Sequence, residues 1–281
     1  MTLLSTLLCL TLATSPTPDA PAEPRITQTE VDYFEGDGAD PVKHTLDIFQ
    51  PEGRQGLPVL LFFHGGVWQQ GDKANYTNVG QALARRGIVT LVVNYRLTPT
   101  VRHPEHTRDA ARAAAWALEN VERFGGRKDR VFLSGHSAGG HLVTLLLFDP
   151  SYLKATGHAP EELAGVIALS GVFDLTRPID DTPEGGFKGF IFPPFGEDKA
   201  ARAAASPVTH LRPVKPPLWV VLAGDDYKDM IKQSKDFVAA LKARKLPVTF
   251  LTVPGRGHFQ LIQRIGSDQD PTTEHLVRIV R

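Results

Sequence analysis

Short hydrophobic runs alternate along the chain with longer segments in which apolar and polar residues follow a helical period. The runs are continuous and rich in Val, Ile, Leu and Phe, which is typical of strands buried on both faces of a sheet. On this pattern we predict eight strands, at Val31–Phe34, His44–Phe49, Val59–His64, Val89–Asn94, Arg130–Ser134, Gly165–Ser170, Leu218–Ala223 and Val248–Val253.

The segments between these strands are amphipathic. Within 107–124, for example, Ala110 and Ala117 belong to an apolar series near helical spacing, and Arg108 and Arg112 lie opposite. The alternation of strand and helix indicates an α/β protein: a mostly parallel eight-stranded sheet with helices on both faces, opened by a small antiparallel pair. The helices are predicted at Asn78–Arg86, Thr107–Phe124, Gly140–Leu147, Ile231–Arg244 and Thr273–Ile279.

We predict one domain over residues 25–281, interrupted by an excursion at 176–213 that is rich in Pro, Gly and Phe and has no clear strand. We expect this excursion to form a short, irregular cap at the carboxyl edge of the sheet, where α/β proteins place their ligands. Its phenylalanines, Phe192 among them, are candidates for substrate binding. Ordinary packing of the cap against the domain is an equally open interpretation.

The first twenty residues have the character of a secretory signal. Leu3–Leu12 is apolar and is followed by small and Pro-rich residues, although no Lys or Arg precedes it. The run is too short to span a bilayer comfortably, so we expect no stable membrane insertion after cleavage. We therefore expect residues 1–20 to direct export to the periplasm or the extracellular space; a non-functional signal would leave the protein in the cytoplasm.

Composition narrows the classes of protein and partner. Hydrophobic residues make up 42% and charged residues 22%, which describes an ordinary globular protein. Lys and Arg number 31 against 31 Asp and Glu, so we expect no nucleic-acid partner. Cys9 is the single cysteine, which excludes an internal disulfide and a cysteine-based zinc site. The sequence does not indicate an oligomeric state.

The strongest chemical motif is Gly135–Gly140, which follows one predicted strand and precedes a helix. This is G-x-S-x-G in the strand–turn–helix setting of a nucleophile elbow. The turn is so sharp that the positions two before and two after the serine crowd each other, and Gly135 and Gly139 occupy them. Ser137 is therefore the predicted nucleophile. His136, beside it, is a candidate for substrate binding, with packing or hydrogen bonding as the other interpretation.

A second motif, His64–Trp68, follows the strand at 59–64. Acyl transfer creates an oxyanion, and consecutive glycines after a central strand present N–H donors without side chains in the way. We predict an oxyanion hole formed by the N–H groups of Gly65, Gly66 and Ala138. Trp68 is a candidate for covering this site and binding substrate.

A serine nucleophile needs a base, and the base needs a carboxylate to orient it. His258 lies in a Gly-rich loop after the last strand, which suits a base that reaches over the sheet edge. Asp226 and Asp225 follow the preceding strand; we favour Asp226 as the acid and leave Asp225 open. Asp174, after an earlier strand, is a further alternative.

Five motifs together resemble the α/β-hydrolase superfamily, and most closely its esterase branch related to hormone-sensitive lipase. They are His64–Trp68, Asn94–Arg96, Gly135–His141, Gly224–Asp226 and Gly257–Phe259. Within that branch the chain is similar to the feruloyl esterase-like, kynurenine formamidase-like and prenylcysteine methylesterase-like members. One departure is that Val67 and Trp68 stand where the lipase-like members carry a third glycine, which weakens an inference toward lipid substrates.

The resemblance implies an α/β-hydrolase fold, a Ser137–Asp226–His258 triad and oxyanion donors from the two glycines and Ala138. We therefore expect a serine esterase that cleaves small or aryl carboxylic esters through an acyl-enzyme, with no metal or organic cofactor. One alternative is an arylformamidase-type amide hydrolase. A second is an inactive scaffold that uses its pocket as a binding module, although such scaffolds usually lose a member of the catalytic set.

Overall fold

A computed structural model of the chain describes residues 24–177 and 186–281. It contains an eight-stranded sheet in the order β1-β2-β4-β3-β5-β6-β7-β8. The strands from β3 onward run parallel, whereas β2 pairs antiparallel with both β1 and β4, so the predicted fold class is confirmed. The strands are β1 Ile26–Asp32, β2 Thr45–Pro51, β3 Leu57–Phe63, β4 Val89–Val93, β5 Gly126–His136, β6 Gly165–Leu169, β7 Leu218–Ala223 and β8 Thr249–Val253.

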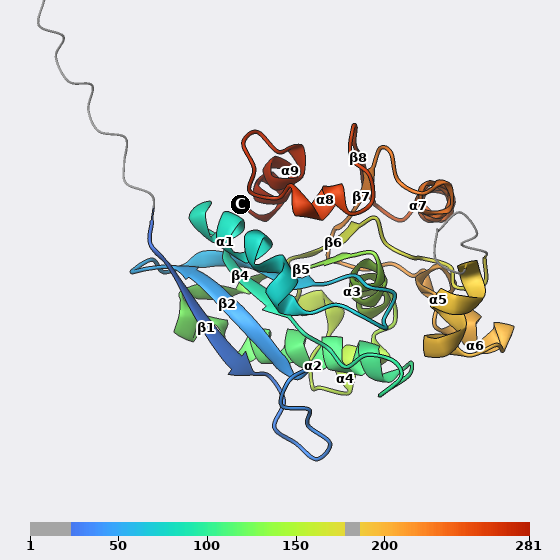
Figure 1. Cartoon of the computed structure of the whole chain (residues 1–281), viewed down its shortest axis with the longest axis horizontal. Coiled ribbons are helices and arrows are strands. Elements are labelled where there is room, and N and C mark those ends of the chain that lie inside the picture. The colour runs from blue at the N-terminus through green and yellow to red at the C-terminus, as the bar shows by residue number, and fades with distance from the viewer. Residues whose placement is uncertain (1–23, 178–185) are drawn as a thin grey trace, which may run out of the picture.

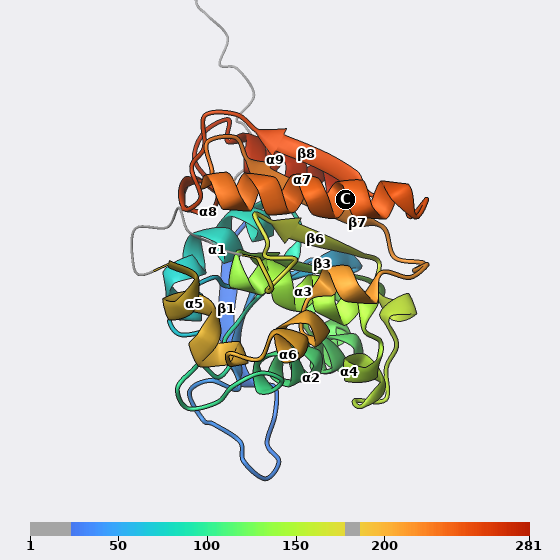
Figure 2. The ribbon, with the colours of Figure 1, turned by 90° about the vertical axis from the view of Figure 1, so that its right-hand side faces the viewer.

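Helices cover both faces of the sheet (Figures 1 and 2). One face carries α1 (Thr77–Arg85), α8 (Gln260–Gln263) and α9 (Pro271–Val280). The other carries α2 (Glu105–Asn120), α3 (Ala138–Phe148) and α7 (Lys228–Ala243). Shorter elements complete the chain at η1 Lys73–Tyr76, η2 Val121–Phe124, α4 Ser151–Lys154 and η3 Pro160–Glu162.

The central strand β3 shows why the sheet needs both layers. Val59, Leu61 and Phe63 pack into the core on the α2–α3–α7 side, while Leu60 and Phe62 pack into the core on the α1–α9 side. Successive side chains of a strand point to opposite faces, so a continuous apolar run supplies two cores at once. All five of these side chains are fully buried.

The first strand differs from the prediction at 31–34. It spans Ile26–Asp32 and pairs with β2 from Ile26↔Pro51 to Asp32↔Thr45. It lies at the edge of the sheet, and its residues Thr27–Glu30 are exposed. An edge strand with polar side chains leaves no apolar run in the sequence, so its position was not visible there.

The excursion at 176–213 contains helices where the sequence indicated irregular structure. They are α5 (Gly186–Phe195), α6 (Lys199–Ala204) and η4 (Pro207–His210). The cap is fastened to the domain by a hydrogen bond from the His103 N–H to the Pro194 carbonyl (2.9 Å). A second bond runs from Gln69 Nε2 to the Gly189 carbonyl (3.0 Å). The cap thus contacts the loop that follows β3.

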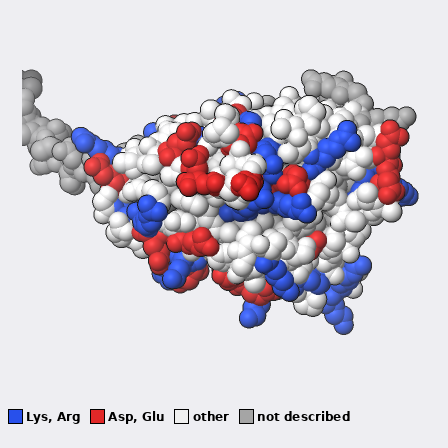
Figure 3. Space-filling view, turned by 90° about the horizontal axis from the view of Figure 1, so that it is seen from below, with Lys and Arg blue, Asp and Glu red and all other residues white. Residues whose placement is uncertain are grey.

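The expected signal at 1–20 lies outside the described residues. No helix in the described ranges 24–177 and 186–281 is long and apolar enough to span a membrane. On the face seen in Figure 3, acidic and basic side chains are interspersed. Within helix α2, for example, Arg108 pairs with Glu105 and Arg112 with Asp109.

Candidate active site

Ser137 stands at the turn between β5 and α3, in a backbone conformation (φ 54°, ψ −114°) that non-glycine residues rarely adopt. Its N–H donates to the Leu169 carbonyl of β6 (3.0 Å), which holds the turn against the sheet. A Cβ at Gly135 would lie 2.3 Å from the Gly139 backbone, and a Cβ at Gly139 would lie 2.1 Å from the Phe63 carbonyl oxygen. There is no room for a side chain at either position, so both must be glycine, as in a nucleophile elbow.

His258 and Asp226 meet at the carboxyl ends of β8 and β7. The Nδ1 atom of His258 lies 2.8 Å from Oδ1 of Asp226, and the same oxygen accepts the Tyr227 N–H (2.8 Å). The Asp226 side chain is fully buried, so it is shielded from water at this contact. Because a carboxylate accepts, Nδ1 donates the proton and Nε2 is left for the pocket.

The other two acids weighed from the sequence lie elsewhere. Asp225 is exposed, and its N–H donates to the Arg256 carbonyl (2.9 Å). The Asp174 carboxylate accepts the Thr176 N–H and pairs with Arg177, which stabilises its own loop. The structure thus brings Asp226, and neither alternative, to His258.

The glycines after β3 lie beside Ser137. A Cβ at Gly65 would lie 3.1 Å from the Ser137 Cβ, and one at Gly66 (φ 117°) would lie 2.1 Å from the Gln70 carbonyl oxygen. Within the described residues, the N–H groups of Gly66 and Ala138 donate to no other protein group. Ala138 opens α3, where the helix dipole adds positive potential. Backbone N–H groups without a protein acceptor are the kind of donor that the predicted oxyanion hole needs.

Tyr76 stands at the edge of this loop. Burial raises the pKa of the Tyr76 hydroxyl, and the Gly65 N–H, which faces that hydroxyl, offsets part of the rise. The Gly65 N–H therefore lies near the Tyr76 hydroxyl.

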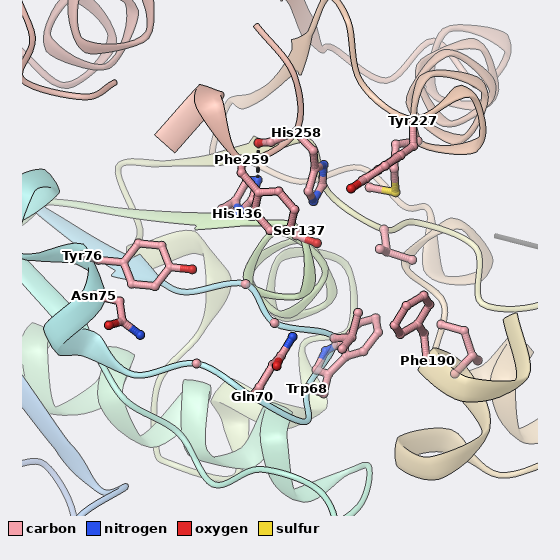
Figure 4. A pocket seen from close by; sticks show the side chains of 17 residues that line it. Trp68, Gln70, Asn75, Tyr76, His136, Ser137, Phe190, Tyr227, His258 and Phe259 are labelled. Carbon is pink, nitrogen blue, oxygen red and sulfur yellow. Dashed lines mark hydrogen bonds between the residues drawn. The ribbon is translucent and has the colours of Figure 1, made fainter. Parts of the chain in front are cut away.

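Ser137 opens into a cavity of about 340 Å³ whose two sides differ (Figure 4). One side is apolar, and the other presents amide and aromatic groups beside Phe259, whose exposed fraction is 59%. In Figure 4, Trp68 and Phe190 lie on the apolar side, and Asn75, Tyr76, His136 and Phe259 lie on the second side. Val172, Ile191 and Met230 add further apolar lining to the cavity.

The structure separates the three predicted substrate-binding residues. Trp68 lines the cavity with only 1% of its surface exposed, because its ring packs edge-on against His141 (centroids 5.0 Å apart). His136 also lines the cavity, but its Nε2 is bound to the His258 carbonyl. Phe192 lies under the guanidinium of Arg202, 4.9 Å from Cζ to the ring centroid, and the preceding residues of α5 reach the cavity instead.

Tyr76, Met230 and Tyr227 also line the cavity, although the sequence did not single them out for this role. For Tyr227, its position directly after the predicted acid Asp226 could have indicated that it lies near the site. Tyr76 and Met230 are brought to the cavity by the tertiary fold, which the sequence pattern does not show. In the part of the chain that the structure describes, no three His, Cys, Asp or Glu side chains are arranged to hold a metal ion.

A mostly parallel eight-stranded sheet with a serine on a strand–helix elbow defines the α/β-hydrolase class. The chain belongs to the BD-FAE family of α/β-hydrolase esterases, whose model matches residues 46–241. The predicted resemblance to the esterase branch is thereby confirmed.

Among curated proteins, the chain is similar to the probable carboxylic ester hydrolase LipM of Mycobacterium tuberculosis, with 30% identity over 72% of this chain and 49% of that protein. It is 28% identical to the isoprenylcysteine alpha-carbonyl methylesterase ICME of Arabidopsis thaliana, over 79% of this chain and 55% of the relative. It is 25% identical to the kynurenine formamidase of Danio rerio, over 91% of this chain and 83% of that protein. The chain spans about half the length of the first two relatives.

Solved structures share the fold. Esterase B from Lactobacillus rhamnosis superposes with a TM-score of 0.77 at 22% identity, covering 91% of this chain and 85% of that one. A truncated carbohydrate esterase from gut microbiota superposes with a TM-score of 0.74 at 19% identity, covering 93% of this chain and 97% of that one.

Proposed function

We propose that this protein is a serine hydrolase that cleaves carboxylic esters through an acyl-enzyme, with Ser137 as nucleophile, His258 as general base and Asp226 as orienting acid. The observation that carries the proposal is the 2.8 Å contact between His258 Nδ1 and the buried Asp226, together with the cavity that both His258 and Ser137 line. Membership of an esterase family and the similarity to LipM and ICME support it.

In the first half-reaction, His258 Nε2 takes the Ser137 proton as Oγ bonds to the acyl carbon. The N–H groups of Gly66 and Ala138, with Gly65 beside them, stabilise the oxyanion. The carbon–oxygen bond to the alcohol then breaks, and His258 returns the proton to the departing oxygen. Water attacks the acyl-enzyme with His258 again as base, which releases the acid and restores Ser137. Asp226 holds the imidazole tautomer and stabilises the imidazolium.

The cavity suits a small or aryl ester. Its volume of about 340 Å³ is at the small end of ligand sites, and the apolar side offers aromatic and aliphatic contacts for an acyl group. We propose a small-molecule ester as the substrate class, without a metal or organic cofactor in the reaction.

The test is a fluorophosphonate probe, with the labelled residue mapped by mass spectrometry, alongside hydrolysis of short-chain p-nitrophenyl esters. Ser137→Ala should abolish both labelling and turnover while the circular dichroism spectrum stays unchanged. Turnover at the wild-type rate in Ser137→Ala would end the proposal. A folded wild-type protein that is neither labelled nor active would instead favour the binding-module interpretation.

A second candidate is arylformamide hydrolysis, because the kynurenine formamidase of Danio rerio matches nearly the whole chain. The same residues would perform it, with an arylamine as leaving group. Comparing kcat/KM for an N-formylarylamine with that for a matched aryl formate ester separates the two: a preference for the amide would replace the ester as the proposed substrate.

We also propose that residues 1–20 direct export, on the apolar run and the small residues that follow it. Fractionation of expressing cells, with the intact mass of the exported form, tests this. Full-length protein confined to the cytoplasm would contradict it.

A further inference from the structure

His136 links the predicted nucleophile to the predicted base. It is the last residue of β5, directly before Ser137, and its Nε2 lies 3.0 Å from the main-chain carbonyl oxygen of His258. Figure 4 shows this bond as a dashed line above Ser137. The two imidazole rings lie 4.5 Å apart between centroids and are tilted by 44°.

The loop that carries His258 needs such support. It contains Gly255 (φ 66°) and Gly257, and Phe259, directly after His258, is largely exposed. Glycine gives backbone freedom, so the Asp226 contact orients the ring without fixing the main chain on which it is mounted. The loop is also held at Arg256, whose carbonyl accepts the Asp225 N–H, and at Gly257, whose carbonyl accepts the Leu261 N–H. The bond from His136 adds a fixed point at His258 itself, so the ring is held by Asp226 and the carbonyl by His136.

The protonation state of His136 follows from its partners. A carbonyl oxygen only accepts, so Nε2 carries the hydrogen and Nδ1 carries a lone pair. Nδ1 is buried without a hydrogen-bond partner, against the Gly65 backbone, where an added Cβ would lie 3.0 Å away. Burial, with the nearby His258, lowers the pKa of His136 well below its usual range.

A neutral donor is what this position requires. During catalysis the His258 ring becomes positively charged, and a second positive charge one ring away would oppose that change. Lysine or arginine would supply an N–H together with a charge, whereas neutral histidine supplies the N–H alone.

We propose that His136 is a positioning residue: through its Nε2–H it fixes the backbone of the His258 loop relative to Ser137 without adding charge to the site. This rests on the proposed function, because its effect runs through His258. The arrangement ties the base to the strand that carries the nucleophile, so the geometry of proton transfer does not depend on a glycine-rich loop alone.

The matched pair of variants is His136→Asn and His136→Gln. The glutamine amide can place an N–H about where Nε2 stands, whereas the asparagine amide is one methylene too short. We expect His136→Asn to lower kcat about 10²-fold, the scale of a displacement of about 1 Å at a catalytic group, with KM little changed. His136→Gln should recover a large part of that loss. Fluorophosphonate labelling of Ser137 should slow in parallel.

A double-mutant cycle with His258→Ala separates positioning from a general structural role. In the His258→Ala background the main-chain carbonyl of residue 258 remains, but the imidazole that it positions is gone, so His136→Asn should cause no further loss of activity. A full second loss there, equal losses in the Asn and Gln variants, or wild-type kcat in His136→Asn would each overturn the inference. Circular dichroism and thermal midpoints establish that the variants fold; if His136→Asn does not, His136→Leu takes its place.

The outcomes also separate this inference from the proposed function. If Ser137→Ala and His258→Ala retain turnover, the proposed triad fails and His136 has nothing to position. If both abolish turnover while His136→Asn behaves as wild type, the inference alone fails.

Discussion

Trp68 packs edge-on against Phe195, with ring centroids 4.7 Å apart and ring planes at 90°. Trp68 lies in the loop that carries the candidate oxyanion glycines, and Phe195 is the last residue of the cap helix α5. Trp68 is held at a positive φ (58°), as is Val67 before it (50°), a conformation that costs about 1–3 kcal/mol per residue and needs surrounding contacts to persist. Phe195 supplies one such contact.

We therefore predict that Phe195→Ala will lower both stability and turnover. Removing a buried phenylalanine costs about 3–5 kcal/mol, and the freed Trp68 should let the oxyanion loop relax, so kcat should fall more than KM changes. Urea unfolding and steady-state kinetics measure the two effects. Val42→Ala, at a side chain that is 61% exposed, is the control and should change neither. Reduced stability with normal kcat would show that the loop does not depend on the cap.

Asp226→Asn should lower kcat by as much as about 10⁴-fold, because an amide cannot stabilise the imidazolium and favours the wrong tautomer of His258. Asp225→Asn, one residue earlier on an exposed side chain, is the matched control and should retain nearly full activity. Kinetics on p-nitrophenyl esters decide between them. The reverse ranking would assign the acid to Asp225.

The parts of the fold and site that were predictable depend on local constraints. Gly135 and Gly139 are demanded by the elbow itself, and the buried strands show continuous apolar runs, so both were visible in the sequence. The choice between Asp225 and Asp226 was not, because neighbouring residues in a loop can turn either way.

What the sequence could not show came from tertiary packing. Phe192 and Phe190 lie in a helix that contains Pro193 and Pro194 near its end, and no apolar stripe indicated which residue would face the cavity. The hydrogen bond from His136 to His258 joins positions 122 residues apart and uses a main-chain carbonyl, which leaves no trace in the type of residue.

Gly66→Ala should impair the oxyanion loop. Its φ of 117° disfavours a side chain, and the added Cβ would lie 2.1 Å from the Gln70 carbonyl oxygen, so the loop must move. Loss of one donor typically lowers kcat by about 10²–10³-fold. Gly53 is the control: it also has a positive φ (71°), but a Cβ added there would have no atom within 4 Å. Gly53→Ala therefore tests backbone strain alone and should leave kcat unchanged. Wild-type kcat in Gly66→Ala would remove Gly66 from the proposed hole.

Stability should fall as the pH drops from 6.5 towards 4, because three histidines near Phe195 are buried in their neutral form and resist protonation. Rings of His103 and His141 lie 5.3 and 5.5 Å from the Phe195 ring. Burial lowers the pKa of His103 and of His106 to about 4, and that of His141 to about 3. In the unfolded chain these groups titrate near 6.5, so between the two values the unfolded state binds more protons, and acid favours it.

Between its folded and unfolded pKa values, each such histidine lowers the free energy of unfolding by up to about 1.4 kcal/mol for every pH unit of acidification. Above the unfolded pKa the free energy of unfolding no longer depends on this histidine's titration. Urea unfolding at pH 7, 6 and 5 measures the slope, and His103→Gln should reduce it by up to one proton. His158→Gln is the contrasting control: burial opposes protonation of His158, but Glu162 and Glu119 outweigh it and raise its pKa. The stabilisation that His158 gives the folded state is therefore fully present below pH 6.5 and is lost as the pH rises through its folded pKa. A slope that is flat between pH 6.5 and 5, or equal in wild type and His103→Gln, would contradict the prediction.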